Sequence, residues 1–107
     1  MYNKNRNIQQ LVTLQSDVEK IKNGQKTAVR RNNRYGEIGD ILQFDSHTFT
    51  LKNAYEQKLG EMTEENAKEE GFENLQQYKD RILSIHQNMK WDPEVKVWVH
   101  ELERVKD

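Results

Sequence analysis

Six cationic side chains stand in one run of the sequence with no acidic residue among them: Lys20, Lys22, Lys26, Arg30, Arg31 and Arg34. Lysine and arginine form charge-assisted hydrogen bonds with anions, so the run predicts an edge that binds phosphate or another anionic group. The formal net charge of the whole chain is only -1, and the glutamate-rich stretch Glu61 to Glu73 balances much of the run. This segregation of charge favours steering of a polyanion or an anionic ligand toward one side of the molecule.

Lys26 and Arg31 are the candidates for direct ligand contact within this run. A lysine that points into a cleft contacts phosphate or assists a reacting hydroxyl group, although most lysines stand in solvent. Residues two apart share a face of an extended strand, so Arg31 projects to the same side as Thr27 and Val29. Arg30 is expected to face the other way. Arg31 therefore offers planar bidentate contacts to phosphate or to a base edge.

Four further side chains are candidates for holding a base. Arg34 and Tyr35 stand in a predicted loop, where a cation and a ring hold a nucleobase or anchor the loop to the core. Trp98 stacks on a base or belongs to the core. His100, next to Glu101 on the last predicted strand, is a candidate to line a cleft.

Glu70 differs from the other glutamates of its predicted helix, which are expected to be solvated. A carboxylate in the last turn opposes the negative end of the helix dipole, and a lysine or a ligand beside it would offset that cost. A Lys26 and Glu70 pair would supply a positive group for an acyl oxygen and a carboxylate for proton transfer. The sequence thus predicts that these two side chains border one hollow.

The 107 residues, 34% of them hydrophobic, are enough for one domain with a small core. We expect residues 1–7 to be a flexible N-terminus and residues 8–107 to be a single domain. No stretch approaches the roughly 20 apolar residues of a membrane span. The first residues also lack the apolar region of a secretory signal, so we expect a cytoplasmic protein without a membrane partner.

Composition also limits the chemistry. The chain has no cysteine, which excludes disulfides, thiol nucleophiles and thiolate metal sites. His47, His86 and His100 have no neighbouring ligand at metal-site spacing, so we expect no metal. No glycine-rich phosphate loop and no Ser-His-Asp order is present, and no cofactor is expected.

The first half of the chain predicts one helix among short strands. Ile8 to Leu14 has the pattern of a first strand, and Ser16 with Glu19 has the form of a capping box that opens a helix, which Gly24 ends. Further strands are predicted by the patterns of Thr27 to Arg31, of Ile38 to Phe44 around Gly39 and Asp40, and of Thr48 to Ala54.

The second half predicts two helices and a last strand. Thr63 caps a helix through Glu70 that Gly71 stops, with Phe72 as the hydrophobic contact after the end. A helix over about Asn74 to Asn88 is predicted by the apolar stripe of Leu75, Tyr78, Ile82, Ile85 and Met89. Val95, Val97 and Val99 occupy every second position, which predicts a closing strand. The pattern favours an α+β fold, a small, partly closed, mixed or antiparallel β-barrel with two or three helices.

Two stretches resemble the ASCH domain family of PUA-like β-barrels. They are Ile21-Lys22-Asn23-Gly24-Gln25-Lys26-Thr27-Ala28-Val29-Arg30-Arg31, which contains a G-x-K-T-x-x-x-R signature, and Gly36-Glu37-Ile38-Gly39-Asp40-Ile41-Leu42, with its G-D turn. The segment from Met62 to Phe72 and the strand Val97 to Glu101 are also similar. The resemblance runs from about Ile8 to the end of the chain. It implies a PUA-like barrel, an RNA or nucleotide-type ligand, and a cleft where the basic turn faces the helices.

Some members that this chain resembles hydrolyse N4-acetylcytidine. They use the lysine of the G-x-K-T motif, a threonine two residues before the motif's arginine, and a glutamate in a T-E-x-x-A-x-x-E helix. Lys26 and Glu70 occupy the lysine and glutamate positions, but Val29 stands at the threonine position, and valine cannot attack a carbonyl. The hydroxyl of Thr27, on the same strand face, would have to act from a displaced position.

Three hypotheses follow. The first is an RNA- or modified-nucleoside-binding domain with Lys26, Arg31, Arg34 and Tyr35 as a basic rim beside Glu70. The second is an amidohydrolase that deacylates N4-acetylcytidine-type nucleosides. Here Lys26 would activate, Thr27 attack and Glu70 transfer protons. The third is a protein-interaction domain whose acidic helical face meets a basic partner.

Overall fold

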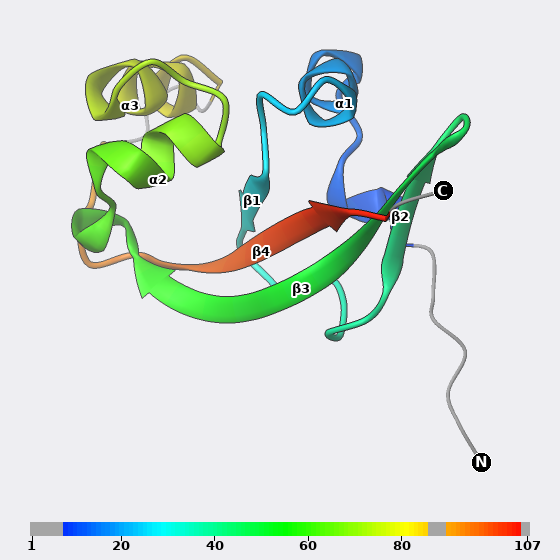
Figure 1. Cartoon of the computed structure of the whole chain (residues 1–107). Helices are drawn as coiled ribbons and strands as arrows, with labels where there is room; N and C mark the ends of the chain where they lie inside the picture. The colour runs from blue at the N-terminus through cyan, green and yellow to red at the C-terminus, as the bar shows by residue number, and fades with distance from the viewer. Residues whose placement is uncertain (1–7, 86–89, 106–107) are drawn as a thin grey trace.

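The computed structural model describes residues 8–85 and 90–105 (Figure 1). Helices α1 (Gln15–Lys22), α2 (Glu64–Glu69) and α3 (Leu75–Ile85) accompany two 3-10 turns, η1 (Gln9–Leu11) and η2 (Leu59–Glu61). The strands are β1 (Ala28–Arg31), β2 (Ile41–Phe44), β3 (His47–Lys58) and β4 (Lys96–Arg104). Two expectations concern residues that are not described: the flexible N-terminus at residues 1–7, and the end of the last predicted helix at Asn88 and Met89.

The four strands form one antiparallel sheet in the order β1-β4-β3-β2. A β-bulge between Leu51 and Asn53 shifts the register of β3 against β4, and bulges bend a strand and increase its twist. The sheet curls into a half-barrel, with α1 and η1 at the β2 end and with α2 and α3 above the other end of β3 and β4 (Figure 1). The predicted α+β, partly closed antiparallel barrel with two or three helices is confirmed.

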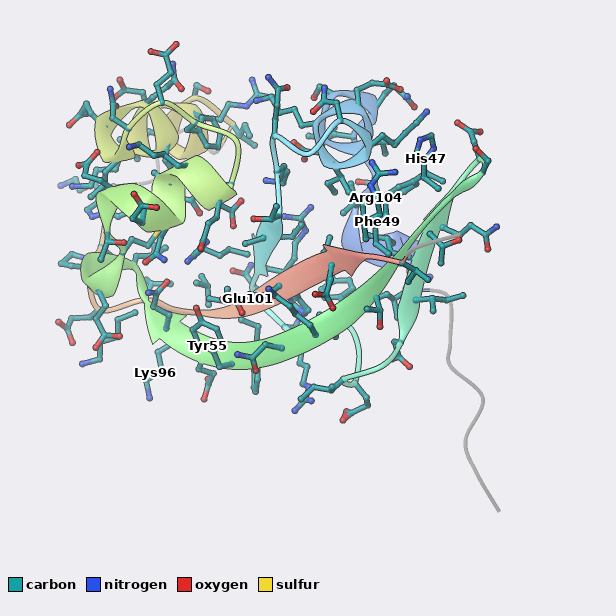
Figure 2. All side chains as sticks on the ribbon, viewed as in Figure 1. His47, Phe49, Tyr55, Lys96, Glu101 and Arg104 are labelled. Atoms are coloured by element: carbon teal, nitrogen blue, oxygen red, sulfur yellow. The ribbon has the colours of Figure 1, made fainter. Side chains whose placement is uncertain are left out.

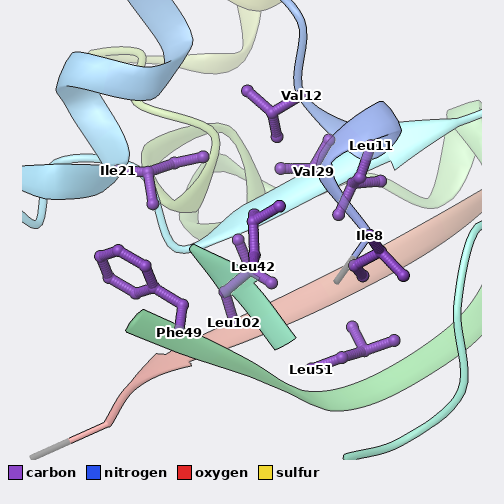
Figure 3. Close-up of a cluster of buried hydrophobic side chains, with 9 residues drawn as sticks. All are labelled: Ile8, Leu11, Val12, Ile21, Val29, Leu42, Phe49, Leu51 and Leu102. Carbon is purple, nitrogen blue, oxygen red and sulfur yellow. The ribbon is translucent and has the colours of Figure 1, made fainter. Parts of the chain in front are cut away.

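Two hydrophobic clusters hold these layers. The barrel cluster unites side chains from η1, α1 and all four strands, namely Ile8, Leu11, Val12, Ile21, Val29, Leu42, Phe49, Leu51 and Leu102 (Figure 3). The helical cluster lies where α2 and α3 cover the sheet, and consists of Leu59, Met62, Ala67, Tyr78 and Val97. Val29 of β1 and Val97 of β4 thus belong to different clusters, although the two strands are neighbours in the sheet.

Two expectations for the N-terminal region are wrong. Residues 9–11 form the 3-10 turn η1 and not a strand, since Ile8 and Leu11, three apart, both turn into the barrel cluster. The amide of Ile8 joins this segment to β2 by donating to the carbonyl of Ile41 at 2.8 Å. The predicted Ser16 cap is also wrong, because the N-cap residue of α1 is Leu14, two residues earlier, and it has no side-chain cap.

The other elements agree with the sequence patterns, except that the strand expected over Ile38 to Phe44 begins at Ile41, because Ile38 and Gly39 form a turn. The strand expected from Thr27 is β1, and the strand predicted to end at Ala54 continues to Lys58. On the stripe of α3, Tyr78 is buried while Ile85 is 48% exposed. Among the described residues, no helix is both long and apolar enough to cross a bilayer.

Candidate functional site

Two glycine-terminated helices bring the candidate residues together. Gly24 (φ +87°) ends the turn after α1 and lets the chain enter β1 through Lys26. Gly71 (φ +91°) ends α2, where its amide donates to the carbonyl of Lys68 and the amide of Phe72 donates to the carbonyl of Ala67. These two bonds are a Schellman motif, the predicted stop of this helix. Glu70 is therefore the C-cap residue of α2.

Lys26 and Glu70 form a buried ion pair. The Nζ of Lys26 lies 2.7 Å from Oε1 of Glu70 and donates to the Glu70 carbonyl at 3.1 Å, with both side chains 4% exposed. The ammonium thus meets the carboxylate and the negative end of α2 together. The sequence-based expectation of a lysine beside Glu70 is met in this geometry.

Arg30 completes the ionic cluster, which we define as Lys26, Arg30 and Glu70. Its Nη1 lies 2.9 Å from Oε2 of Glu70, and its side chain is 1% exposed. Its Nε and Nη2 donate to Oε1 of Gln57, at 3.1 and 3.0 Å. Gln57 donates in turn to Oδ1 of Asn66 in α2, at 3.1 Å. The cluster is therefore oriented by groups from β3 and α2.

A cavity of about 380 Å³ opens beside the ionic cluster. Its walls are largely apolar, with Leu59, Phe72, Tyr78, Ile82, Val95 and Val97. Arg31, Asn32, Arg81 and Asp17 also line it, as do the exposed side chains of Leu14 and Ile85. The hollow thus combines buried charge, apolar walls and further arginines.

The predicted site residues separate into two groups. Lys26, Glu70 and Arg31 line the cavity. Thr27 does not line it and is exposed, while its amide donates to the carbonyl of Glu69 at 2.7 Å. Val29, at the position of the family's threonine, is fully buried in the barrel cluster.

Arg30 is the cluster member that sequence reasoning missed as a site residue. The side chain of Arg30 points away from Val29, as expected, and contacts Glu70 on that side of the strand. Lys26 and Arg30 are four apart along extended backbone, so the alternation of side chains puts them on one side. That spacing was the signal available in the sequence. Arg81 and Tyr78 of α3 were missed as lining residues because only the packing of α3 brings them here.

Arg34, Tyr35, Trp98 and His100 do not line the cavity and gather around the loop after β1. The guanidinium of Arg34 lies 5.4 Å from the ring centre of Trp98. Its Nε donates to the carbonyl of Gly36 at 2.9 Å, and its Nη2 lies 3.1 Å from Oε1 of Glu37. The ring of Tyr35 meets His100 edge to face, with centroids 6.1 Å apart. These groups anchor the loop to β4.

His100 is fully buried and bonded on both ring nitrogens. Its Nδ1 lies 3.1 Å from the carbonyl of Val29, and its Nε2 accepts from the amide of Tyr35 at 3.0 Å. A carbonyl only accepts and an amide only donates, so the ring is the neutral tautomer with its proton on Nδ1. Burial lowers the pKa of His100, and the nearby cations Arg31 and Arg34 act in the same direction.

Tyr78 adds a neutral donor to the cavity. Burial raises the pKa of its phenol well above the ordinary value, and the charge of Glu70 raises it further. The hydroxyl therefore keeps its proton and is available as a donor. Among residues 8–85 and 90–105, no three His, Asp or Glu side chains come together to hold a metal ion.

The basic run is divided in space. Lys22 lies 2.8 Å from Oδ2 of Asp45 and 3.7 Å from Oε2 of Glu19. The Nζ of Lys20 lies 5.0 Å from the ring centre of Phe72, beside the end of α2. At the other end of the sheet from α2 and α3, Arg104 covers Phe49 (Figure 2) and donates to the carbonyl of Lys22. The six cations therefore do not form one patch: Lys26 and Arg30 share Glu70, and of the six only Lys26, Arg30 and Arg31 line the cavity.

No protein-family model and no curated protein matches this sequence. A solved structure does match the fold: the high-resolution crystal structure of an ASCH domain from Lactobacillus crispatus JV V101, with a TM-score of 0.69. The match covers 83% of this chain and 70% of that chain, at 9% sequence identity. At such identity the likeness shows the fold alone. The chain thus has the ASCH-like fold that its sequence resemblance implies.

Proposed function

We propose that the chain binds a modified nucleoside, free or within RNA, in the cavity beside the ionic cluster. The observation that carries the proposal is the ionic cluster itself, three buried charged side chains at an open cavity. Buried ions are costly to maintain for stability alone and are commonly retained for function. The ASCH-like fold, through its resemblance to RNA-associated PUA-like barrels, supports the choice of ligand class.

The cavity has features suited to one base. Its volume of about 380 Å³ lies low in the range of small-molecule sites, so it fits a single nucleoside better than several stacked ones. Phe72 and Tyr78 supply aromatic surface, and bases of single-stranded RNA are held by such stacking. Arg31 and Arg81 also line the cavity and would supply contacts to neighbouring phosphates.

Arg31→Ala tests the proposal through RNA binding. We would titrate fluorescent single-stranded RNA, with and without N4-acetylcytidine, at several salt concentrations. Losing one phosphate contact should weaken binding about tenfold at low salt and reduce the salt slope by about 1. The matched control is Lys96→Ala, because Lys96 is an exposed cation on the side of the sheet away from α2 and α3 (Figure 2). Absence of RNA binding, or an equal effect of both substitutions, would contradict the proposal.

The amidohydrolase hypothesis is favoured by one observation, the 2.7 Å contact between Lys26 and Glu70. It needs a nucleophile other than Val29, and the exposed Thr27 is not among the cavity residues. The same N4-acetylcytidine samples should be followed for release of acetate. Turnover that is lost in Lys26→Ala and in Glu70→Ala would replace the binding proposal with the enzymatic one.

A further inference from the structure

The ionic cluster has one more positive than negative charge. Lys26 and Arg30 are cations and Glu70 is the carboxylate that both contact, at 2.7 and 2.9 Å. All three side chains are 4% exposed or less. Since a buried ion is stabilised mainly by an opposite charge, one further anion would make the positive and negative charges of the cluster equal.

The cluster also has donors left over. The ammonium of Lys26 has three hydrogens, and its partners among the described residues are the carboxylate and carbonyl of Glu70. The guanidinium of Arg30 has five, and its described partners Gln57 and Glu70 take three bonds. The protonated hydroxyl of Tyr78 lines the same cavity. Acceptors from a ligand would satisfy these groups.

We propose that the ligand of this cavity has a single carboxylate, on an apolar or aromatic body, that sits against Lys26 and Arg30. This inference rests on the proposed function and specifies the ligand, namely a nucleoside whose base bears a carboxylate-containing modification. The apolar walls receive the body, and the carboxylate reaches the buried cations. One negative charge makes the cluster neutral.

The charge count favours a carboxylate over a phosphate monoester. A monoester has a charge of about -1.5 to -2 at neutral pH, which would leave the buried cluster negative. A carboxylate has one charge and two oxygens that match the fork of a guanidinium. Rim arginines such as Arg31 remain for the phosphates of an RNA chain.

The test compares matched nucleosides on the native protein. The probes are 5-carboxymethyluridine, its neutral amide 5-carbamoylmethyluridine, and uridine 5′-monophosphate, measured by titration calorimetry at neutral pH. Hydrogen bonds to charged groups favour the carboxylate over the amide by about 10- to 100-fold in Kd. The monophosphate should bind more weakly than the carboxylate.

A substitution in the cluster extends the test. Lys26→Met leaves Arg30 and Glu70 as a neutral pair, so the carboxylate and the amide should bind alike. Lys96→Gln is the matched control: it removes an exposed cation outside the cavity and should leave the ratio of the two affinities unchanged. Thermal unfolding reports whether each variant is folded. The main comparison uses only the native protein, so it gives a result even if Lys26→Met does not fold.

Each result has a defined meaning. Equal binding of carboxylate and amide, or tighter binding of the monophosphate, overturns the carboxylate inference but leaves nucleoside binding intact. If none of the three probes binds while RNA does, the carboxylate inference is also overturned. If neither the probes nor RNA bind, the proposed function fails with it.

Discussion

At the scale of single residues, His100 holds the loop after β1 in place. Its neutral ring accepts from the amide of Tyr35 and donates to the carbonyl of Val29, at 3.0 and 3.1 Å. The loop follows directly on Arg31, so this histidine also helps to set where Arg31 lies at the cavity. A buried ring with both nitrogens bonded is a positioning group and is not available for contact with a ligand.

Because of His100, the free energy of unfolding should decrease at acidic pH. Its pKa is lowered from the ordinary value of 6.5 in the folded chain, so below that value the unfolded chain binds a proton that the folded chain does not. The free energy of unfolding should therefore decrease as the pH falls below 6.5, and level off below the folded-state pKa. In His100→Gln this component is absent, so the stability lost by the substitution should shrink between about pH 7.5 and about pH 5.

Urea unfolding at a series of pH values measures this difference. His47→Gln is the control, because it removes another histidine from a different part of the sheet. Parallel profiles for the native protein and His100→Gln would show that His100 does not produce the pH dependence.

The sequence predicted Lys26 and Glu70 as site residues, but it selected Arg31 and not Arg30 as the arginine of the site. The choice treated the face of Thr27 and Val29 as the ligand side, whereas Val29 packs in the barrel cluster. Two clusters lie on opposite faces of the same sheet, and a sequence pattern does not state which face a cavity borders. The assigned roles of Lys26, Thr27 and Glu70 in catalysis stay predictions.

At the scale of elements, α2 is a short helix held at both ends. Thr63 Oγ1 accepts from the amide of Asn66 at 3.1 Å, and Asn66 Oδ1 accepts from the amide of Thr63 at 3.0 Å. Gly71 ends the helix in the left-handed region. Such local signals are readable in the sequence, which is why this helix was predicted within one residue.

The structure of the N-terminal segment could not be predicted from its own sequence. Apolar residues between Ile8 and Leu14 suit a strand or one turn of helix, and a short run does not distinguish them. The packing of Ile8 and Leu11 in the barrel cluster favours the 3-10 turn over a strand. That contact depends on the curled shape of the sheet and cannot be predicted from the segment alone.

Gly71→Ala and Gly24→Ala form a matched pair at the element scale. Both glycines have positive φ, +91° and +87°, so each alanine should lower the free energy of unfolding by about 1–2 kcal/mol. A Cβ at Gly71 would lie 3.1 Å from Cδ of Lys20 and 3.6 Å from Cβ of Lys26, whereas one at Gly24 meets nothing within 4 Å. Only Gly71→Ala should therefore also weaken RNA binding.

Chemical denaturation and the RNA titration measure the two effects separately. Equal binding by both variants would mean that the end of α2 does not position the ionic cluster. Weakened binding in Gly24→Ala alone would place the sensitive turn at the start of β1 instead.

At the scale of the whole molecule, the ionic cluster joins two separately packed parts. The barrel cluster and the helical cluster have no residue in common. The helical layer is connected to β1 and to the two residues before it. Glu70 contacts Lys26 and Arg30, and the Thr27 amide donates to the Glu69 carbonyl at 2.7 Å. A ligand that neutralises the cluster would therefore also tighten the helices against the sheet.

Glu70→Ala tests this connection. Removing the carboxylate leaves two buried cations without their counter-ion, so we expect a loss of about 3–5 kcal/mol in the free energy of unfolding. Glu65→Ala on the same helix is the control, because its 4.0 Å contact with Lys68 is exposed and should contribute less than about 1 kcal/mol.

Hydrogen exchange locates the loss of stability in Glu70→Ala. The amide of Thr27, bonded to α2, should exchange faster through local detachment of the helices. The amide of Leu51, which donates to the carbonyl of Asp40 at 2.8 Å within the barrel, should change only as far as global stability does. An equal loss of protection at both amides would mean that the two parts unfold as one unit. In that case the ionic cluster is part of a single core, and a ligand bound there would stabilise the whole molecule evenly.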